Sequence, residues 1–208
     1  MKLHVFPPSP RAAKVLALVH HLGLDCEVAI VDLFSGGNQT PAFKALNPNG
    51  RMPVLEDDGF VLWESNAILQ YLGAKKPESG VWPADPRRQA DVSRWQFWDA
   101  SHWDPTCATF IFERVVKQMT GQGAPDAAQV AKAETDFARF APVLNATLQG
   151  RRWVTGDTIT VADFGLGAPL LYAAPAGIPL ADHPEIARWY AALAELPAWK
   201  KVSPPPPG

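Results

Sequence analysis

The feature that most constrains the fold is a change of pattern near residue 76. Before it, strand-like runs alternate with helical segments in the order β-α-β-α-β-β-α, and only helical segments follow it. That order predicts mixed parallel and antiparallel pairing with helices on both faces of a sheet. We therefore expect an α/β unit over residues 1–76, an all-helical unit over 84–202, and an extended proline-rich tail over 203–208.

The first unit begins with a strand, a helix and a second strand. Leu3 to Phe6 is a short apolar strand that prolines end, and Arg11 to Leu22 has apolar residues at helical spacing before Gly23. Cys26 to Val31 is predicted as a second, buried strand parallel to the first. The remaining predicted elements are a short helix from Thr40-Pro41 to about Leu46, hairpin strands over 54–56 and 60–63, and a helix over 65–72.

The second unit carries one strong local signal. Thr160 to Asp163 fits an N-terminal capping box, with Ile159 and Phe164 flanking it as a hydrophobic staple. The motif predicts where a helix begins and indicates a structural role. The predicted helices of this unit span 86–103, 106–120, 125–148, 161–172 and 184–196.

Composition excludes several classes of protein. The net charge of −2 gives no electrostatic case for binding nucleic acid or an anionic membrane. No apolar run approaches the ~18 residues that span a bilayer, and the first residues lack the apolar stretch of a signal peptide. These observations favour a soluble, cytoplasmic protein.

The cysteines and histidines offer little chemistry. The chain has 2 cysteines, Cys26 and Cys107, far apart and outside any Cys-x-x-Cys motif. This argues against a disulfide framework and against a dithiol redox enzyme, so each is expected to be a small core residue. His20-His21 has no metal-ligand partners at suitable spacing, and no metal is expected.

Met52-Pro53 directly precedes an apolar strand. Proline cannot donate to a sheet ladder, so it belongs at a strand's first position or at an edge. One interpretation is simply a strand that starts after a turn. The other is a cis bond, which would leave the N–H and C=O of Met52 free to pair with a peptide ligand.

Two helix starts could bind charged groups. Ser65 is placed to cap a helix, with Glu64 just before it. The pair could hold an amino-acid head group, with Glu64 on the ammonium and Ser65 and free N–H groups on the carboxylate, or could be an ordinary cap. Ser9, between the first strand and the first helix, could donate a hydrogen bond to a thiolate, or it could only cap the helix.

The first unit and several segments together resemble the cytosolic glutathione S-transferases over residues 1–202. The likeness is to serine-type classes: phi, theta, delta or a related bacterial class. It implies an N-terminal thioredoxin-like domain that binds glutathione, a C-terminal helical bundle domain that carries the electrophile site, and a homodimer. The segments that carry it are Asn47 to Leu55, Glu64 to Leu72, Ile159 to Asp163 and Pro197-Ala198-Trp199.

The resemblance also implies roles for single residues. Ser9 matches the residue that supplies the catalytic hydroxyl in the serine-type classes, and Pro53 matches the cis-proline of the family. Asp163 matches an aspartate that caps a helix and supports folding, not a catalytic residue. The glutathione-binding residues that it implies are Asn38, Gln39, Arg51, Met52, Pro53, Glu64 and Ser65.

This chain departs from the family pattern at two places. Asn38 and Gln39 stand where related enzymes often hold the glycyl carboxylate of glutathione with basic side chains. Their amides can hydrogen-bond a carboxylate but lack charge, so we expect binding either to be weaker or to depend on Arg51 or Lys44. The prolines around Ser9 are uncommon and could shift its hydroxyl.

The implied reaction is attack of a glutathione thiolate on a hydrophobic electrophile, as in detoxification. The free thiol has a pKa near ~8.5, and Ser9 with the positive end of the first helix should lower it. Most of the aromatic run after residue 94 should be core or subunit contact. His102 could be a general acid or base, or merely hydrogen-bonded or solvated. The electrophile pocket is expected to include His102, Trp103, Thr106 and Phe110.

Two other functions remain open. The same scaffold could support a glutathione-dependent isomerase, peroxidase or reductive dehalogenase. It could also be a non-catalytic module that binds glutathione or another ligand.

Overall fold

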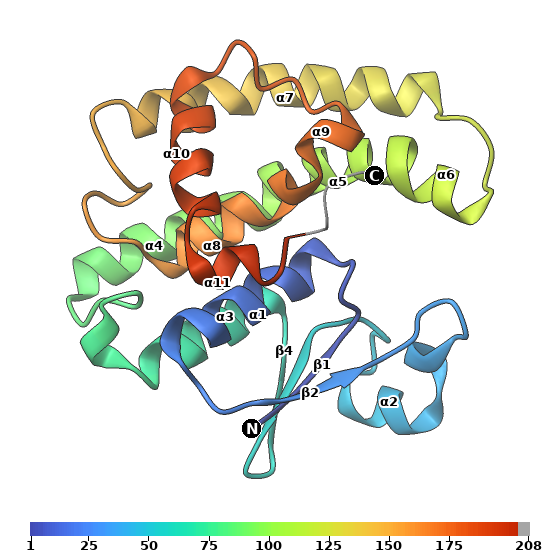
Figure 1. The fold of residues 1–208 in the computed structure, drawn as a ribbon, viewed down its shortest axis with the longest axis vertical. Coiled ribbons are helices and arrows are strands. Elements are labelled where there is room, and N and C mark those ends of the chain that lie inside the picture. Colours follow the sequence, from blue (N-terminus) through green and yellow to red (C-terminus); the bar gives the residue numbers. More distant parts are fainter. Residues whose placement is uncertain (204–208) are drawn as a thin grey trace.

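A four-stranded sheet forms the base of the molecule in the computed structural model, which describes residues 1–203 (Figure 1). The strand order is β2-β1-β3-β4, with β1 parallel to β2 and antiparallel to β3, and β3 antiparallel to β4. This confirms the mixed sheet predicted from the sequence. All but Ser203 of the predicted tail lies outside the described residues. The strands are β1 (Lys2–Val5), β2 (Glu27–Ile30), β3 (Val54–Asp57) and β4 (Phe60–Trp63).

Helices cover both faces of this sheet because side chains alternate along each strand. Leu3 and Leu55 are fully buried in the core that α1 (Pro10–Leu22) and α3 (Ser65–Ala74) share. On the other face, Phe43 of α2 (Pro41–Leu46) packs with Val31 and Val54. The hydroxyl of Thr40 accepts from the N–H of Phe43, as its predicted capping role requires.

The second strand corrects one prediction. The sequence predicts a buried strand over Cys26 to Val31, but β2 is an edge strand with Val28 44% and Ile30 71% exposed. Within residues 1–203 only β1 pairs with it, so β2 lies at one edge of the sheet, where its apolar side chains are less covered. An apolar run predicts a strand, but it does not indicate whether that strand lies in the centre of the sheet or at its edge.

After α3, the described chain consists of helices joined by loops. One continuous helix runs through α4 (Pro86–Trp98), α5 (Asp104–Ile111) and α6 (Lys117–Thr120), joined by the π-helical turns Asp99–Trp103 and Phe112–Val116. The break predicted between residues 103 and 106 is therefore absent. Pro105 lacks an N–H, and a wide turn just before it accommodates that loss. The other helices are α7 (Ala127–Leu148), α8 (Val161–Gly167), α9 (Ala173–Ala176), α10 (Pro184–Ala194) and α11 (Pro197–Lys200).

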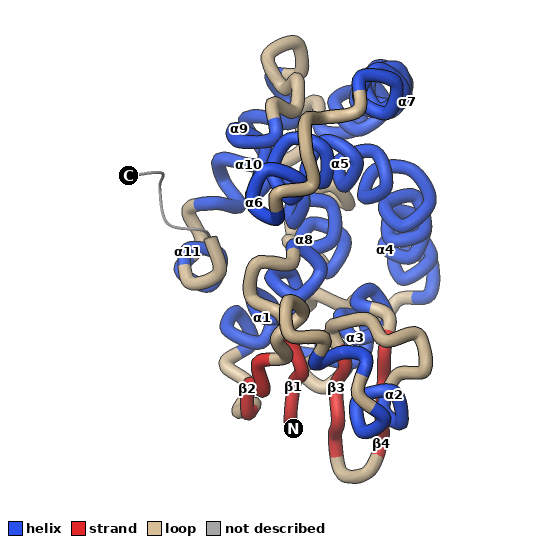
Figure 2. The backbone as a smooth tube through the Cα atoms, turned by 90° about the vertical axis from the view of Figure 1, so that its right-hand side faces the viewer, coloured by secondary structure: helices blue, strands red, loops and turns tan. Residues whose placement is uncertain are grey.

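Helices α4 to α11, here called the helical part, lie on the side of α1 and α3 that faces away from the sheet (Figure 2). Helix α8 contacts both α1 and α3, and α11 contacts α1. The expected fold, a thioredoxin-like domain followed by a helical bundle domain, is confirmed, while the boundaries at residues 76 and 84 stay predictions. No helix within residues 1–203 is both long and apolar enough to cross a membrane.

Helix α8 begins at the predicted capping box. The Asp163 carboxylate accepts from the N–H of Thr160 at 2.8 Å and from its hydroxyl at 3.2 Å. It also accepts from the Val154 N–H and from Trp189 Nε1, each at 2.9 Å. The sequence showed only the first partner. This fully buried carboxylate therefore joins a loop, α8 and α10 at one point.

Asp163→Ala should lower the free energy of unfolding by about 3 kcal/mol or more, because several buried donors lose a charged acceptor at once. Urea unfolding followed by circular dichroism measures this change. Asp182→Ala, at an exposed position of the same helical part, is the control and should change stability by less than about 0.5 kcal/mol. Equal effects of the two substitutions would contradict the role assigned to Asp163.

Candidate active site

The strand register brings the three predicted segments to one end of the sheet. His4, near the end of β1, pairs with Val54 at the start of antiparallel β3, and Val54 also pairs with Trp63 at the end of β4. The residues just outside these strand ends therefore lie near one another. They are the loop from Phe6 to Ser9 after β1 (the Ser9 loop), Met52-Pro53 before β3, and Glu64-Ser65 after β4.

A cleft of about 530 Å³ opens where these segments meet the helical part. Most of the predicted glutathione-site residues line it, while Gln39 and Lys44 do not. Several residues that the sequence analysis did not single out line it as well. The lining consists of Phe6, Ser9, Arg11, Lys14, Leu33, Asn38, Asn47, Gly50, Arg51, Met52, Pro53, Glu64, Ser65, Asn66, Asp99, Ala100, Asp104 and Pro105.

Ser9 occupies the N-cap position of α1 without using its side chain there. Its carbonyl accepts from the N–H groups of Ala12 and Ala13, but its hydroxyl makes no capping hydrogen bond. The simple capping role that the sequence left open is therefore not what this side chain does. A half-buried hydroxyl at the positive end of a 13-residue helix remains available to a ligand in the cleft.

The Met52–Pro53 peptide bond is cis, as the resemblance implied. Within residues 1–203, neither the N–H nor the C=O of Met52 has a main-chain hydrogen-bond partner. Side chains hold the preceding segment instead: Asn38 Nδ2 donates to the Gly50 carbonyl and Asn47 Nδ2 to the Arg51 carbonyl, each at 2.7 Å. The segment is thus fixed while the main chain of Met52 stays available.

Gly50 explains where Gln39 lies. The φ angle of Gly50 is +61°, and a Cβ there would lie 3.1 Å from the Asn38 carbonyl oxygen and from Gln39 Nε2. The side-chain amide of the exposed Gln39 therefore lies beside Gly50, which lines the cleft. Gln39 does not line the cleft itself, and its role in binding glutathione stays a prediction. Asn38 does line the cleft, with its amide nitrogen engaged by Gly50.

Glu64 has a strained backbone, with φ 72° and ψ 109°. Conformations of this kind cost about 1–3 kcal/mol in a non-glycine residue and are concentrated at functional sites. Glu64 holds the N-cap position of α3, and Ser65 is the buried first residue of that helix rather than its predicted cap. The exposed Glu64 side chain makes no capping bond.

Some of the charged side chains that line the cleft form ion pairs with each other, and others do not. Arg11 donates to Asp104 through Nε at 3.1 Å and also through Nη2, and Lys14 Nζ lies 3.4 Å from Asp99 Oδ2. Within residues 1–203, Arg51 and Glu64 take part in no ion pair. One cation and one anion on the cleft wall therefore remain for a ligand that carries both charges.

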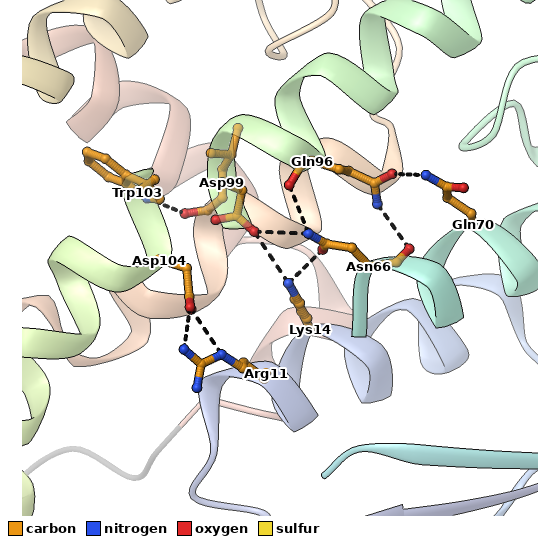
Figure 3. A network of polar contacts seen from close by, with 9 residues as sticks. Arg11, Lys14, Asn66, Gln70, Gln96, Asp99, Trp103 and Asp104 are labelled. Atoms are coloured by element: carbon orange, nitrogen blue, oxygen red, sulfur yellow. Dashed lines mark hydrogen bonds and ion pairs between the residues drawn. The ribbon is translucent and has the colours of Figure 1, made fainter. Parts of the chain in front are cut away.

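The Lys14–Asp99 contact belongs to a polar network that joins the two parts of the molecule (Figure 3). Lys14 Nζ donates to Asn66 Oδ1 at 2.7 Å, and Asn66 Nδ2 donates to the Gln96 carbonyl at 3.0 Å. Gln70 donates to Gln96 Oε1 at 2.6 Å. Burial raises the pKa of Asp99, and the Lys14 ammonium opposes that rise. Asp99 Oδ1 has no hydrogen-bond partner within the described chain.

Two of the predicted electrophile-site residues lie elsewhere. Trp103 and Phe110 are fully buried in the core, and Trp103 Nε1 donates to the Leu166 carbonyl at 2.9 Å. The structure corrects their prediction as pocket residues, because both rings pack into the core, whereas Phe97 and Phe112 of the same continuous helix are exposed. His102 and Thr106 line a separate cavity of about 310 Å³ between α5 and α7, which shares Pro105 with the main cleft.

The cysteines lie outside the main cleft. Cys107 is fully buried and Cys26 is partly buried against the core. Burial is the largest cause of a raised pKa for both thiols, so neither is an activated nucleophile. No group of three or more His, Cys, Asp or Glu side chains in residues 1–203 is arranged to hold a metal ion, and the absence of a metal stays a prediction.

Two of the cleft residues that were not predicted from the sequence nevertheless stand out in it. Lys14 interrupts the apolar face of α1, and Asp99 is a single acid within an aromatic run. A charged residue at a buried position is retained when it is paired. Nothing in the sequence, however, identified the partner of either one.

Lys14→Met should lower stability by about 3 kcal/mol or more, because it leaves Asp99 buried without its cation. A raised carboxyl pKa means that the folded state binds the proton more tightly than the unfolded state. The associated stability is present below the ordinary carboxyl pKa and is lost as pH rises through the raised value. Without Lys14 this loss should extend to higher pH, which urea unfolding at a series of pH values measures.

The control for this prediction removes both charges. Asp99→Asn in the Lys14→Met background should restore part of the lost stability and flatten the added pH dependence. Identical pH profiles of the Lys14→Met variant and the unmodified protein would show that the contact does not compensate Asp99.

Comparisons with known proteins agree with this geometry. Residues 1–74 match the family model described as "Glutathione S-transferase, N-terminal domain", and residues 102–197 match "Glutathione S-transferase, C-terminal domain". A curated relative, glutathione S-transferase 3 of Zea mays, is 35% identical across 100% of this chain and 97% of its own length.

Solved structures share the fold over nearly the whole chain. Glutathione transferase F7 from Populus trichocarpa superimposes with a TM-score of 0.89 at 29% identity, covering 97% of this chain and 96% of that one. A theta-class glutathione S-transferase from Xanthomonas axonopodis pv. citri, solved with glutathione bound, gives 0.87 at 28% identity over 97% and 96%. The fold, the cleft and these relatives lead to one conclusion: the chain belongs to the glutathione S-transferase family.

Proposed function

We propose that the cleft binds glutathione and that Ser9 stabilises its thiolate for attack on a hydrophobic electrophile, as in serine-type glutathione transferases. The observation that carries the proposal is the hydroxyl of Ser9 at the start of α1, which makes no capping hydrogen bond and lies in the cleft that also presents the Met52 main chain and Glu64.

The charges of the cleft match those of glutathione. The main chain of Met52 would pair with the cysteinyl part as a short added strand. Glu64, which has no ion-pair partner within residues 1–203, would hold the γ-glutamyl ammonium, with Ser65 and the start of α3 on the adjacent carboxylate. Arg51 would hold the glycyl carboxylate, with Asn38 beside it. Lys44 lies outside the cleft, which favours Arg51 for this role.

Thiolate stabilisation is the chemical step that the protein supplies. A hydrogen bond from Ser9 and the positive end of α1 both favour the charged form of the sulfur, so the pKa of the bound thiol falls. Each unit of that fall raises the thiolate fraction up to tenfold near neutral pH and corresponds to about 1.4 kcal/mol. The sulfur then forms a bond to the electrophile. In a substitution the leaving group departs with its bonding electron pair; in an addition the attacked double bond or strained ring opens, and the atom that receives its electron pair takes up a proton from solvent.

The second substrate would enter beside the helical part. Phe6, Leu33, Ala100 and Pro105 supply apolar surface next to Ser9. These residues replace Trp103 and Phe110 in our proposal for the electrophile site. His102 and Thr106 would contribute only to a ligand that reaches the adjoining cavity.

A glutathione-dependent isomerase, peroxidase or dehalogenase would use the same thiolate, so the geometry of the cleft does not favour one of them. The homodimer expected from the resemblance stays a proposal. It is supported by the exposed aromatic side chains of Phe60, Trp63 and Phe97. The cytoplasmic location also stays a prediction.

Ser9→Ala tests the catalytic assignment. The loss of one positioned donor to a developing or full negative charge should lower kcat/KM by about 10²-fold. The pKa of the bound glutathione thiol, followed by thiolate absorbance against pH, should rise toward the value of free glutathione. A bound thiol whose pKa equals that of free glutathione in the unmodified protein would instead favour a non-catalytic binding module.

Glu64→Gln is the matched variant for binding. It keeps the length of the side chain but removes the charge, so KM for glutathione should rise about tenfold or more. The pKa of the bound thiol should change little at saturating glutathione. Unchanged KM would remove Glu64 from the binding site without affecting the role of Ser9.

A further inference from the structure

The loop that carries Ser9 is poor in hydrogen-bond donors. Pro7, Pro8 and Pro10 have no main-chain N–H. The one remaining main-chain donor, the N–H of Ser9, bonds the Phe6 carbonyl at 2.9 Å and closes a turn. Further hydrogen bonds to this loop must therefore come from donors elsewhere in the protein to its carbonyl groups.

Tyr172 supplies such a donor from the helical part. Its hydroxyl donates to the Pro8 carbonyl at 2.8 Å, across 164 positions of sequence. Burial raises the pKa of Tyr172 above its ordinary value. The hydroxyl therefore stays protonated and remains a donor throughout the neutral range.

The segment that carries Tyr172 is well packed. Tyr172 ends the 3₁₀ turn Ala168–Tyr172, in which Ala168, Pro169 and Leu170 are buried. This turn follows directly from α8, whose start the Asp163 carboxylate fixes, and it contacts α1. The donor therefore projects from a rigid segment of the helical part.

A second contact holds the other side of Ser9. Arg11, two positions after Ser9, donates to Asp104 of α5. The helical part thus contacts the chain on both sides of Ser9, at the Pro8 carbonyl and at the Arg11 side chain. Neither contact consumes the Ser9 hydroxyl.

We infer that Tyr172 is a positioning residue for the reaction: its hydrogen bond to Pro8 sets the direction in which the Ser9 hydroxyl meets the glutathione sulfur. This inference rests on the proposed role of Ser9. Tyr172 is absent from the lining of the cleft. It therefore acts through Pro8 and Ser9 and does not touch the substrate.

Tyr172→Phe removes the hydroxyl and keeps the ring. Near neutral pH, kcat/KM should fall about fivefold, the change expected for one lost hydrogen bond. The pKa of the bound glutathione thiol should rise, while KM for glutathione stays unchanged because its binding groups are elsewhere. Tyr190→Phe, on α10, removes the same hydroxyl from another part of the helical region and should change none of these quantities.

The readout separates positioning from a purely structural role. The titratable groups that line the cleft are the same in every variant, so a shift of the thiol pKa reports the changed hydroxyl contact. They are Arg11, Lys14, Arg51, Glu64, Asp99 and Asp104. A Tyr172→Phe protein with a lower melting temperature but the original thiol pKa and kcat/KM would overturn the inference.

Ser9→Ala distinguishes this failure from failure of the proposed function. If Tyr172 acts through Ser9, Tyr172→Phe should have no further effect in the Ser9→Ala background. A fivefold effect that persists there would overturn the inference. If Ser9→Ala shifts the thiol pKa and Tyr172→Phe does not, only the positioning role fails. If Ser9→Ala itself leaves the thiol pKa unchanged, the catalytic assignment and the inference both fail.

Discussion

The buried contact between Lys14 and Asp99 is the interaction on which the placement of the site depends. Both side chains are almost inaccessible to solvent, and their charged atoms lie 3.4 Å apart. A buried ion pair adds little net stability compared with apolar packing, but an unpaired buried charge is costly. The contact therefore penalises other arrangements of α1 against the π-helical turn. Ser9 begins the helix that carries Lys14, and Glu64 precedes the helix that carries Asn66, so the same network sets the two helix starts that face the cleft.

The sequence predicted best what depends on local pattern. The order of strands and helices in the first unit, the turn before Met52-Pro53 and the helix that starts after Thr160 all follow from spacing, capping and proline rules. The candidate binding residues at 9, 52–53 and 64–65 were found for the same reason, since each stands beside a strand end. The family resemblance then supplied the cis bond, which local pattern left open.

What the sequence missed depends on packing between distant segments. An apolar run could not show that β2 would be an edge strand or that Trp103 and Phe110 would point into the core. The partners of Lys14 and Tyr172 lie 85 and 164 positions away, so no local spacing indicates them. These residues join the helical part to the thioredoxin-like part. In the proposed mechanism the helical part contributes to the site in two ways: it forms the wall beside which a second substrate would bind, and its contacts hold the chain on both sides of Ser9.

A crystal structure of the protein with glutathione bound tests the central proposal most directly. The proposal predicts the glutathione sulfur within hydrogen-bond distance of Ser9 Oγ, the cysteinyl main chain paired with Met52, and the γ-glutamyl ammonium beside Glu64. A complex in which another side chain lies nearest the sulfur, with the Ser9 hydroxyl turned away, would contradict the catalytic role assigned to Ser9.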